Sequence, residues 1–160
     1  MPGTDGGAVD DREVVARQIG RPPRAFRRVV VRCPFGRPAV TEQAPFDEGG
    51  RPFPTQFYVT CPYLVAQISR LEAVGGVERW TRATHESAEL AESLERAHAD
   101  QRALRPELPG GIGGATRGGS LKCLHAHTAF ALARPGYALG DRILRDVGDL
   151  WPADGCCTDV

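Results

Sequence analysis

The sequence lacks several features that would identify a class of protein at once. Its 20 basic and 20 acidic residues cancel, so it has no overall charge of the kind that draws proteins to nucleic acid or anionic membranes. No apolar run is long enough to span a bilayer, and the start MPGTDGGAVDD has neither the basic nor the apolar part of a secretory signal. We therefore expect a cytoplasmic protein without a membrane partner, for which nucleic acid is a disfavoured partner.

Several chemical motifs are also missing. The sequence has no internal repeat, no complete catalytic motif and no CxxC pair, which is the strong mark of zinc ribbons and fingers. The segment PGGIGGATRGGS has the GxxxxG spacing of a phosphate-binding loop, but Gly119 stands where that motif requires lysine, and no strand precedes it. The sequence therefore identifies neither a substrate nor a reaction.

What is present is enough for one folded domain. The chain has 160 residues, of which 41% are hydrophobic, and this suits a single compact core. We expect a single α+β domain over residues 11–151, between a disordered N-terminus (1–10) and a loose C-terminal tail (152–160) that carries Cys156 and Cys157.

Hydrophobic periodicity predicts an α+β fold, a small, mostly antiparallel three-stranded sheet packed with four or five helices. β-Branched runs bounded by prolines predict the strands, at 26–32, 38–43 and 55–60. Amphipathic patterns and capping residues predict the helices, at about 11–19, 62–74, 84–104, 121–134 and 141–150, and only a turn at 77–81.

The most informative segment is Cys123-Leu124-His125-Ala126-His127, at the start of a helix that is apolar on most sides. A buried helix has little reason to carry a thiol and two imidazoles unless they bond to something. At about 100° per residue, Cys123 and His127 share one face of the helix, whereas His125 points nearly the opposite way. We therefore expect His127 to be a ligand and His125 to be a core histidine.

Two further cysteines, Cys33 and Cys61, each stand at the end of a predicted strand and directly before a proline. In an antiparallel meander the first and third strands run the same way, so both cysteines would leave the sheet at one edge, roughly 9–10 Å apart. That separation is too large for a disulfide, but converging side chains can share a metal. Cys61 also lies at a helix start, where the dipole favours a thiolate.

We therefore predict one zinc-like site, structural rather than catalytic, with an iron–sulfur cluster as a variant. Its expected ligands are Cys33, Cys61, Cys123 and His127, with His125, Cys156 and Cys157 as secondary candidates. Three alternatives stay open: the cysteines are buried small hydrophobes, the protein is a thiol enzyme using Cys61 or Cys123 with a histidine base, or it is an interaction module for an unknown protein partner.

The glycine-rich loop before the Cys/His helix suggests a second, weaker site. Backbone amides at a helix start can bind a phosphate, and the candidate residues are Gly113, Gly114, Arg117, Ser120 and Lys122. A plain linker or a cover over the Cys/His site would explain the loop as well. His85 and His98 lie in a charged helical region and are expected to face solvent.

Four spaced motifs resemble those of a known family. They are RCPFGRPAV, FPTQFYVTCPYL, GGIGG and KCLHAHTAFALA, and the resemblance extends over roughly residues 12–157. Together they resemble the actinobacterial domain-of-unknown-function family 501. The resemblance implies a small cytosolic protein with no assigned activity, substrate or cofactor. Its motif positions correspond to Cys33, Cys61, Cys123, His125 and His127.

Overall fold

The computed structural model describes residues 10–116 and 121–158. Within these residues the chain forms one three-stranded antiparallel sheet and six α-helices, which confirms the predicted α+β class with more helices than the four or five expected. In chain order the elements are α1 (Asp11–Ile19), β1 (Phe26–Arg32), β2 (Pro38–Gln43), β3 (Phe57–Val59), α2 (Pro62–Ala73), α3 (Gly76–Glu86), α4 (Ala88–Leu104), the short 3-10 helix η1 (Ile112–Gly114), α5 (Leu124–Ala133) and α6 (Ala138–Val147).

The sheet is a meander in the order β1-β2-β3, as the sequence predicts. β1 and β2 have the expected bounds, and β3 is shorter than the expected 55–60, although the Thr60 N–H still donates to the Ala39 carbonyl at 2.9 Å. Since β1 and β3 run in the same direction, Cys33 and Cys61 follow them at the same edge of the sheet. Every residue of the central strand β2 is buried.

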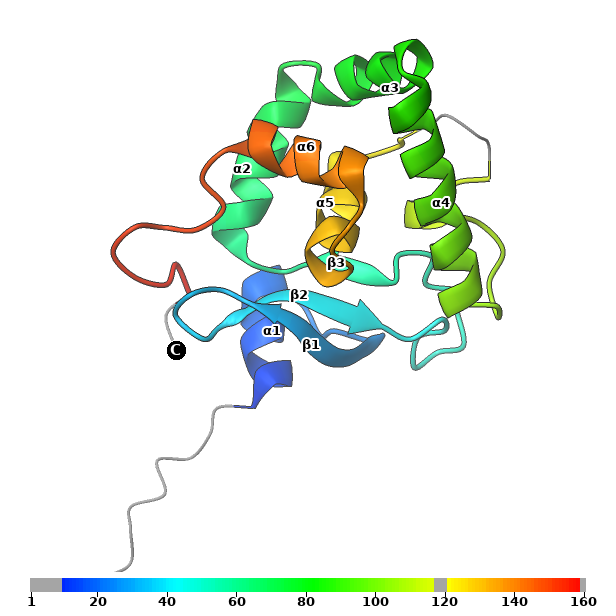
Figure 1. The fold of residues 1–160 in the computed structure, drawn as a ribbon. Helices are drawn as coiled ribbons and strands as arrows, with labels where there is room; N and C mark the ends of the chain where they lie inside the picture. The colour runs from blue at the N-terminus through cyan, green and yellow to red at the C-terminus, as the bar shows by residue number, and fades with distance from the viewer. Residues whose placement is uncertain (1–9, 117–120, 159–160) are drawn as a thin grey trace, which may run out of the picture.

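Helices cover the sheet unequally (Figure 1). α5 lies in the middle of the larger layer and packs on β3, with α2, α4 and α6 around it, whereas α1 contacts β1 and β2 from the other side. The core is formed by aliphatic residues from all of these elements, among them Val40, Leu64, Leu124, Leu139 and Ile143. The expectation that the apolar helix near residue 124 is buried is confirmed, because seven of its ten residues are buried.

Two helix predictions need correction. Residues 76–86 form the full helix α3 rather than a turn, and Ser87 separates it from α4 because its extended backbone lets the Ser87 side chain cap the Leu90 N–H at 3.3 Å. α5 begins at Leu124, three residues later than predicted. Cys123 is its N-cap, with extended φ and ψ angles of −146° and 151°. Lys122 before it has a φ of 59°, in the left-handed region.

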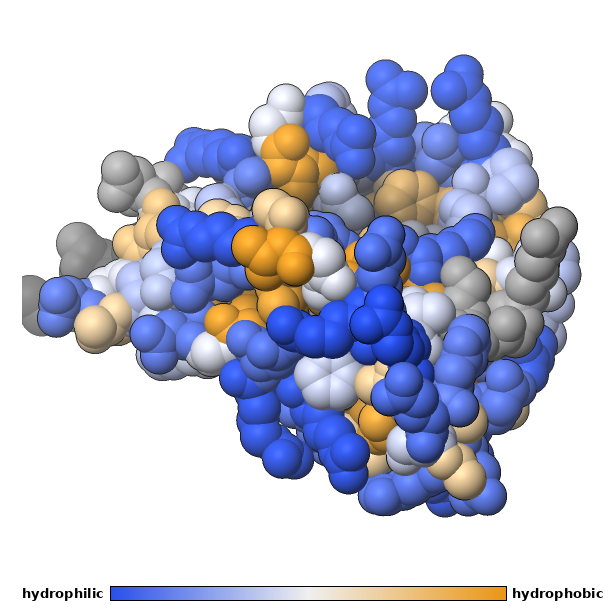
Figure 2. All heavy atoms as spheres, turned by 90° about the horizontal axis from the view of Figure 1, so that it is seen from above, coloured by the Kyte–Doolittle hydropathy of each residue, from blue (hydrophilic) through white to orange (hydrophobic). Residues whose placement is uncertain are grey.

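The surface is mostly polar. On the face shown in Figure 2, hydrophobic residues form small islands between hydrophilic ones. Among the described residues, the exposed large hydrophobic side chains are Phe35, Phe46, Val74 and Leu104, which come from different parts of the chain. None of the helices in the described ranges is both long and apolar enough to cross a membrane.

Candidate metal centre

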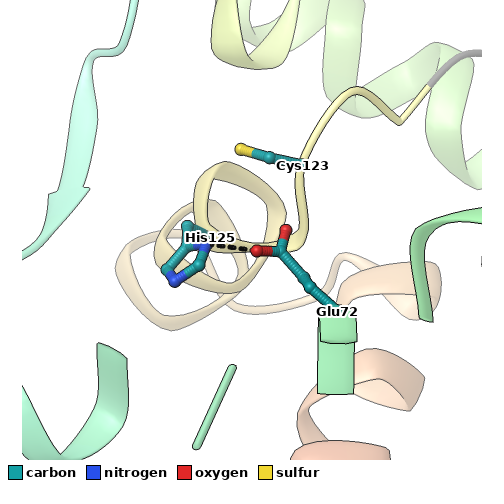
Figure 3. Close-up of side chains that lie close together, drawn as sticks. All are labelled: Glu72, Cys123 and His125. Atoms are coloured by element: carbon teal, nitrogen blue, oxygen red, sulfur yellow. Dashed lines mark ion pairs between the residues drawn. The ribbon is translucent and has the colours of Figure 1, made fainter. Parts of the chain in front are cut away.

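Three side chains from two helices form the one cluster of potential metal ligands found among the described residues. These are Glu72, Cys123 and His125, and one ligand atom from each lies within 4.8 Å of the others. Figure 3 shows Glu72 reaching from the end of α2 toward His125 in the first turn of α5, with Cys123 just before that helix. All three are partly exposed, so an ion can reach them from solvent.

The carboxylate of Glu72 organises this cluster. One oxygen lies 3.0 Å from His125 Nδ1, and the other accepts the Leu124 N–H at 2.8 Å. The second ring nitrogen of His125 lies 3.3 Å from the Ser69 hydroxyl, so the imidazole is held between two residues of α2. The side chains of His125 and Glu72 are 29% and 24% exposed. The pair is therefore partly solvated and open to exchange with an ion.

The position of Glu72 is explained by the two helix dipoles. It lies in the last turn of α2, where the partial negative charge of the helix end disfavours a carboxylate. The start of α5 carries the opposite partial charge, and its first N–H group binds Glu72 directly. The packing of α2 against α5 thus places the carboxylate in a favourable field beside Cys123 and His125.

The three side chains of the cluster are of types that zinc accepts as ligands. Zinc binds carboxylate oxygen, imidazole nitrogen and thiolate sulfur with bonds of roughly 2.0–2.3 Å, which places neighbouring ligand atoms about 3.3–3.8 Å apart. In the cluster, Glu72 Oε1 and His125 Nδ1 are 3.0 Å apart, and the three ligand atoms lie within 4.8 Å of one another. Three ligands of these types would leave a fourth coordination position.

A cleft adjoins the cluster on the sheet side. It has a volume of about 290 Å³, and Phe57, Val59, Val65, Cys123 and His125 are among the residues that line it. The lining from β3 and α2 is largely apolar, whereas Cys123 and His125 supply polar groups at its wall. A small molecule held there would contact both residues.

The structure pairs Cys123 with His125, whereas the sequence predicts a pair with His127. The prediction assumed that Cys123 lies inside the helix, four residues before His127. Because Cys123 is the extended N-cap instead, the 100° rule does not govern its direction. His125 therefore lies at the cluster and His127 lies in the core, the reverse of the expected roles.

His127 has no free ring nitrogen to offer a metal. It is 0% exposed, with Nε2 3.0 Å from the Leu121 carbonyl and Nδ1 2.8 Å from the Tyr137 hydroxyl. A carbonyl only accepts, so Nε2–H donates to Leu121 and Nδ1 accepts from Tyr137. Burial, and secondarily the neighbouring His98, lowers the pKa of His127 to about 4, so it is neutral at pH 7.

His98 is buried beside His127, contrary to the expectation that it faces solvent. Its Nδ1 accepts the Ile112 N–H at 3.0 Å, and its Nε2 is buried without a protein partner. Burial lowers the pKa of His98. The charged pattern of α4 hid this contact because the loop that covers His98 comes from residues 111–112, which are remote in sequence.

The other predicted thiols do not join the cluster. Cys33 is buried in the core, and its N–H closes the turn to the Arg37 carbonyl at 2.9 Å. Cys61 is also buried, and its Sγ lies 3.7 Å from Cys157 Sγ. Cys156 is partly buried against the core, and its sulfur accepts the Thr158 N–H at 3.3 Å. The expected set of Cys33, Cys61, Cys123 and His127 is thus distributed over several places.

The predicted anion site is only partly described. Arg117 and Ser120 lie outside the described residues. Gly113 and Gly114 belong to η1, and the Lys122 ammonium donates to the Gly114 carbonyl at 3.4 Å. The helix start that would bind a phosphate is displaced to Leu124, and its N–H already binds the carboxylate of Glu72. One backbone donor near the expected anion site therefore binds an internal carboxylate.

Sequence reasoning did not select Glu72, which the structure places in the candidate cluster. The one sign in the sequence is the position of this carboxylate, in the last turn of an amphipathic helix and next to the buried Leu71. Neither the negative end of the helix dipole nor an apolar neighbourhood stabilises a negative charge there. Such a residue needs a partner elsewhere in the fold. The identity of that partner, on α5, required the tertiary structure.

No curated protein and no solved structure matches the chain. A family model described as "Protein of unknown function (DUF501)" matches residues 29–110, which is just over half of the 160 residues. The matched span includes Cys33, Cys61 and Glu72, whereas Cys123 and His125 follow it, so the match is shorter than the resemblance suggested. The chain belongs to the DUF501 family.

Proposed function

We propose that the protein binds a divalent transition metal, zinc in the first place, through Glu72, Cys123 and His125. The observation that carries the proposal is the approach of these three ligand atoms to within 4.8 Å of one another, although Glu72 precedes Cys123 by 51 residues and His125 by 53. A single thiolate in the group favours zinc over an iron–sulfur cluster, which cysteines normally hold. We place this function in the cytosol, where thiols stay reduced.

The number of ligands bears on what the metal does. Four protein ligands close a zinc site, whereas three leave a position for water or a substrate. The sequence-based expectation of a structural site assumed four ligands. With three, the bound ion would act as a Lewis acid next to the cleft lined by Phe57, Val59 and Val65. The surrounding apolar side chains would exclude bulk water from a ligand bound there.

The proton balance of the site supports a role for pH in metal binding. Nδ1 of His125 faces a carboxylate oxygen, which only accepts, so in the neutral ring this nitrogen carries the proton, and a metal bound there would move that proton to Nε2 without releasing it. The thiol of Cys123, in contrast, must lose its proton to become a ligand. Metal binding therefore releases the thiol proton, and the apparent affinity should rise with pH.

A second function, thiol catalysis by Cys123, is favoured by one specific observation. Glu72 lies 3.0 Å from Nδ1 of His125. In a triad of nucleophile, base and orienting group, the orienting group contacts the base in this way. In that function Cys123, at the start of α5, would be the nucleophile and His125 its base. Both functions use the same three side chains, but they predict opposite behaviour of the thiol.

Zinc titration of protein purified without a metal-affinity tag tests the proposal. After chelator treatment, we expect one zinc ion per chain, with an affinity at least about 100-fold lower in His125→Ala, Cys123→Ser and Glu72→Ala. Cobalt in place of zinc should give a sulfur-to-metal charge-transfer band that Cys123→Ser abolishes. Matched controls are His85→Ala and Cys157→Ser, because both side chains are exposed and lie outside the cluster.

Alkylation of Cys123 separates the two functions. If zinc binds, the metal protects Cys123 from iodoacetamide until a chelator is added. If the thiol enzyme is correct, Cys123 reacts rapidly in the metal-free protein, zinc does not bind with one-to-one stoichiometry, and Glu72→Gln slows the reaction. A protein that shows neither behaviour is best explained as an interaction module, and the proposed function is then wrong.

A further inference from the structure

A second pair of groups lies apart from the metal cluster, where the start of α2 meets the C-terminal segment. The sulfur atoms of Cys61 and Cys157 are 3.7 Å apart, although the residues are separated by 96 positions in the sequence. Cys61 is the N-cap residue of α2 and is 3% exposed, whereas Cys157 is exposed. One thiol is therefore shielded by the core and the other is accessible to reagents in solution.

Other contacts hold the C-terminal segment at this position. The side-chain amide of Gln18, on α1, donates to the Thr158 hydroxyl at 3.2 Å and to the Pro38 carbonyl at 2.8 Å. Trp151 and Cys156 of the same segment pack against the hydrophobic core. The approach of Cys157 to Cys61 thus belongs to a segment whose described residues contact α1 and the core.

We propose that Cys61 and Cys157 are a redox pair that forms a reversible disulfide and links the C-terminal segment covalently to the start of α2. Both are free thiols in this structure. The proposal concerns different residues from the metal cluster and is independent of the proposed function. It makes Cys157, rather than its neighbour Cys156, the site of modification.

The geometry favours Cys157 over Cys156. A disulfide needs the two sulfur atoms at about 2.05 Å, so they must approach by roughly 1.7 Å from 3.7 Å. Cys157 lies in a segment without helix or strand, which can adjust by this amount while α2 stays in place. The sulfur of Cys156 instead makes a local hydrogen bond, accepting the Thr158 N–H at 3.3 Å.

The difference in exposure sets the order of events. With a low-molecular-weight disulfide such as oxidised glutathione as oxidant, the thiolate of exposed Cys157 attacks one sulfur and releases one glutathione thiolate. Cys61 then attacks the Cys157 sulfur of the mixed disulfide, the protein disulfide forms, and the second glutathione thiolate leaves. Two protein thiols are oxidised, one glutathione disulfide is reduced, and the two protein protons pass to the two glutathione thiolates.

Burial makes Cys61 the slow partner. Its pKa is raised to about 11, first by burial and further by the nearby Cys157, so at neutral pH it is almost entirely a thiol. Only the thiolate attacks a disulfide, and its fraction grows about tenfold per pH unit below the pKa. Closure of the protein disulfide should therefore accelerate with pH, after a mixed disulfide has formed at Cys157.

Non-reducing peptide mapping of the oxidised full-length protein tests the proposal. The reduced chain is incubated with oxidised glutathione under native conditions, alkylated, digested and analysed by mass spectrometry. We expect a cross-link between Cys61 and Cys157 in the wild type and in Cys156→Ser, and at least a tenfold loss of cross-linked Cys61 in Cys157→Ser. Cys156→Ser and Cys157→Ser each replace one sulfur atom by oxygen. Both residues lie outside helices and strands, so folding should be preserved.

Two further readouts keep the result unambiguous. Dithiothreitol should reverse the cross-link, and in denaturant the preference for Cys157 over Cys156 should disappear, since only the fold selects between adjacent thiols. The disulfide should also raise Tm in the wild type and Cys156→Ser, but not in Cys157→Ser. The proposal is overturned if Cys61 stays a free thiol after native oxidation, or if Cys156→Ser and Cys157→Ser lose the cross-link equally.

Discussion

Two imidazoles of α5, only two residues apart, have opposite environments. His125 is partly exposed and lies beside the Glu72 carboxylate and the Cys123 thiol, while His127 is buried between Leu121, Tyr137 and His98. Because successive helical residues turn by about 100°, a spacing of two sends the rings to nearly opposite sides of the helix. The comparison teaches that a histidine is available to a metal only where its ring nitrogens are not already committed to the core.

The strongest test of this contrast is His127→Leu. The substitution leaves the Leu121 carbonyl and the Tyr137 hydroxyl buried without their partner, so we expect the free energy of unfolding to fall by about 3 kcal/mol. Urea unfolding followed by circular dichroism measures the change. Zinc affinity should stay within a few-fold of the wild type. A loss of zinc binding in a folded His127→Leu protein would reverse the roles assigned to the two histidines.

The pH dependence of stability tests the same assignment. His127 has a pKa of about 4 in the folded protein and about 6.5 when unfolded, so below pH 6.5 the unfolded chain binds the extra proton. Its contribution is complete above pH 6.5 and is lost as pH falls toward 4, by roughly 3 kcal/mol in total. Buried His98, whose pKa is also lowered, acts in the same direction.

The difference between the wild type and His127→Leu isolates the contribution of His127 to the pH dependence of stability. Urea unfolding at several pH values between 4 and 7 should show a clearly flatter profile for His127→Leu than for the wild type. Equal slopes in wild type and His127→Leu would mean that His127 is protonated as easily in the fold as outside it.

A smaller effect is expected from Tyr137→Phe. The hydroxyl of Tyr137 donates to His127 Nδ1 at 2.8 Å, and its removal deletes one buried hydrogen bond while the aromatic ring stays packed against Phe130. We expect a loss of about 1–2 kcal/mol in the free energy of unfolding. Tyr58→Phe is a matched control, since that ring is only partly buried. Equal losses in the two variants would contradict a specific role for the contact between Tyr137 and His127.

The smallest change in stability is expected for His125→Ala. Its contact with the Glu72 carboxylate is partly exposed, and even charged pairs with such exposure contribute at most about 1 kcal/mol. Measured in the presence of a chelator, the variant should therefore unfold close to the wild type. With saturating zinc the wild type should gain stability through binding, and His125→Ala should not. A large loss in chelator would show that His125 supports the core instead of a ligand site.

Much of the fold was predictable because the signals are local. The β-branched run at 26–32 and the prolines beside it define β1, and Pro62 defines the start of α2, since proline suits the first turn of a helix. The separation of α3 from α4 was missed because the cap at Ser87 competes with a continuous helical pattern. The start of α5 was missed because Cys123 has extended and Lys122 left-handed backbone angles, which their residue types do not predict.

The candidate site was predicted in part. Cys123 and the segment around His125 were selected from composition alone, since thiols and imidazoles are unusual on a buried helix. Glu72 was not selected, because its role arises from the packing of α2 against α5. Strand direction led us to expect Cys33 and Cys61 to bind the same metal as Cys123. Two residues that leave a sheet at one edge need not direct their side chains to a common point.

The sequence by itself determined the secondary structure of most of the chain and which thiols and imidazoles are available to a site, because both follow from residue type and short-range pattern. Only the tertiary structure decided which histidine faces Cys123, which carboxylate completes the cluster and which cysteine meets Cys61. These choices depend on the direction of side chains from elements far apart in sequence. Cys123 shows this, because it lies just outside α5 and its direction follows from extended backbone angles rather than from the helical turn of about 100° per residue, and no local pattern specifies where a helix begins to that accuracy.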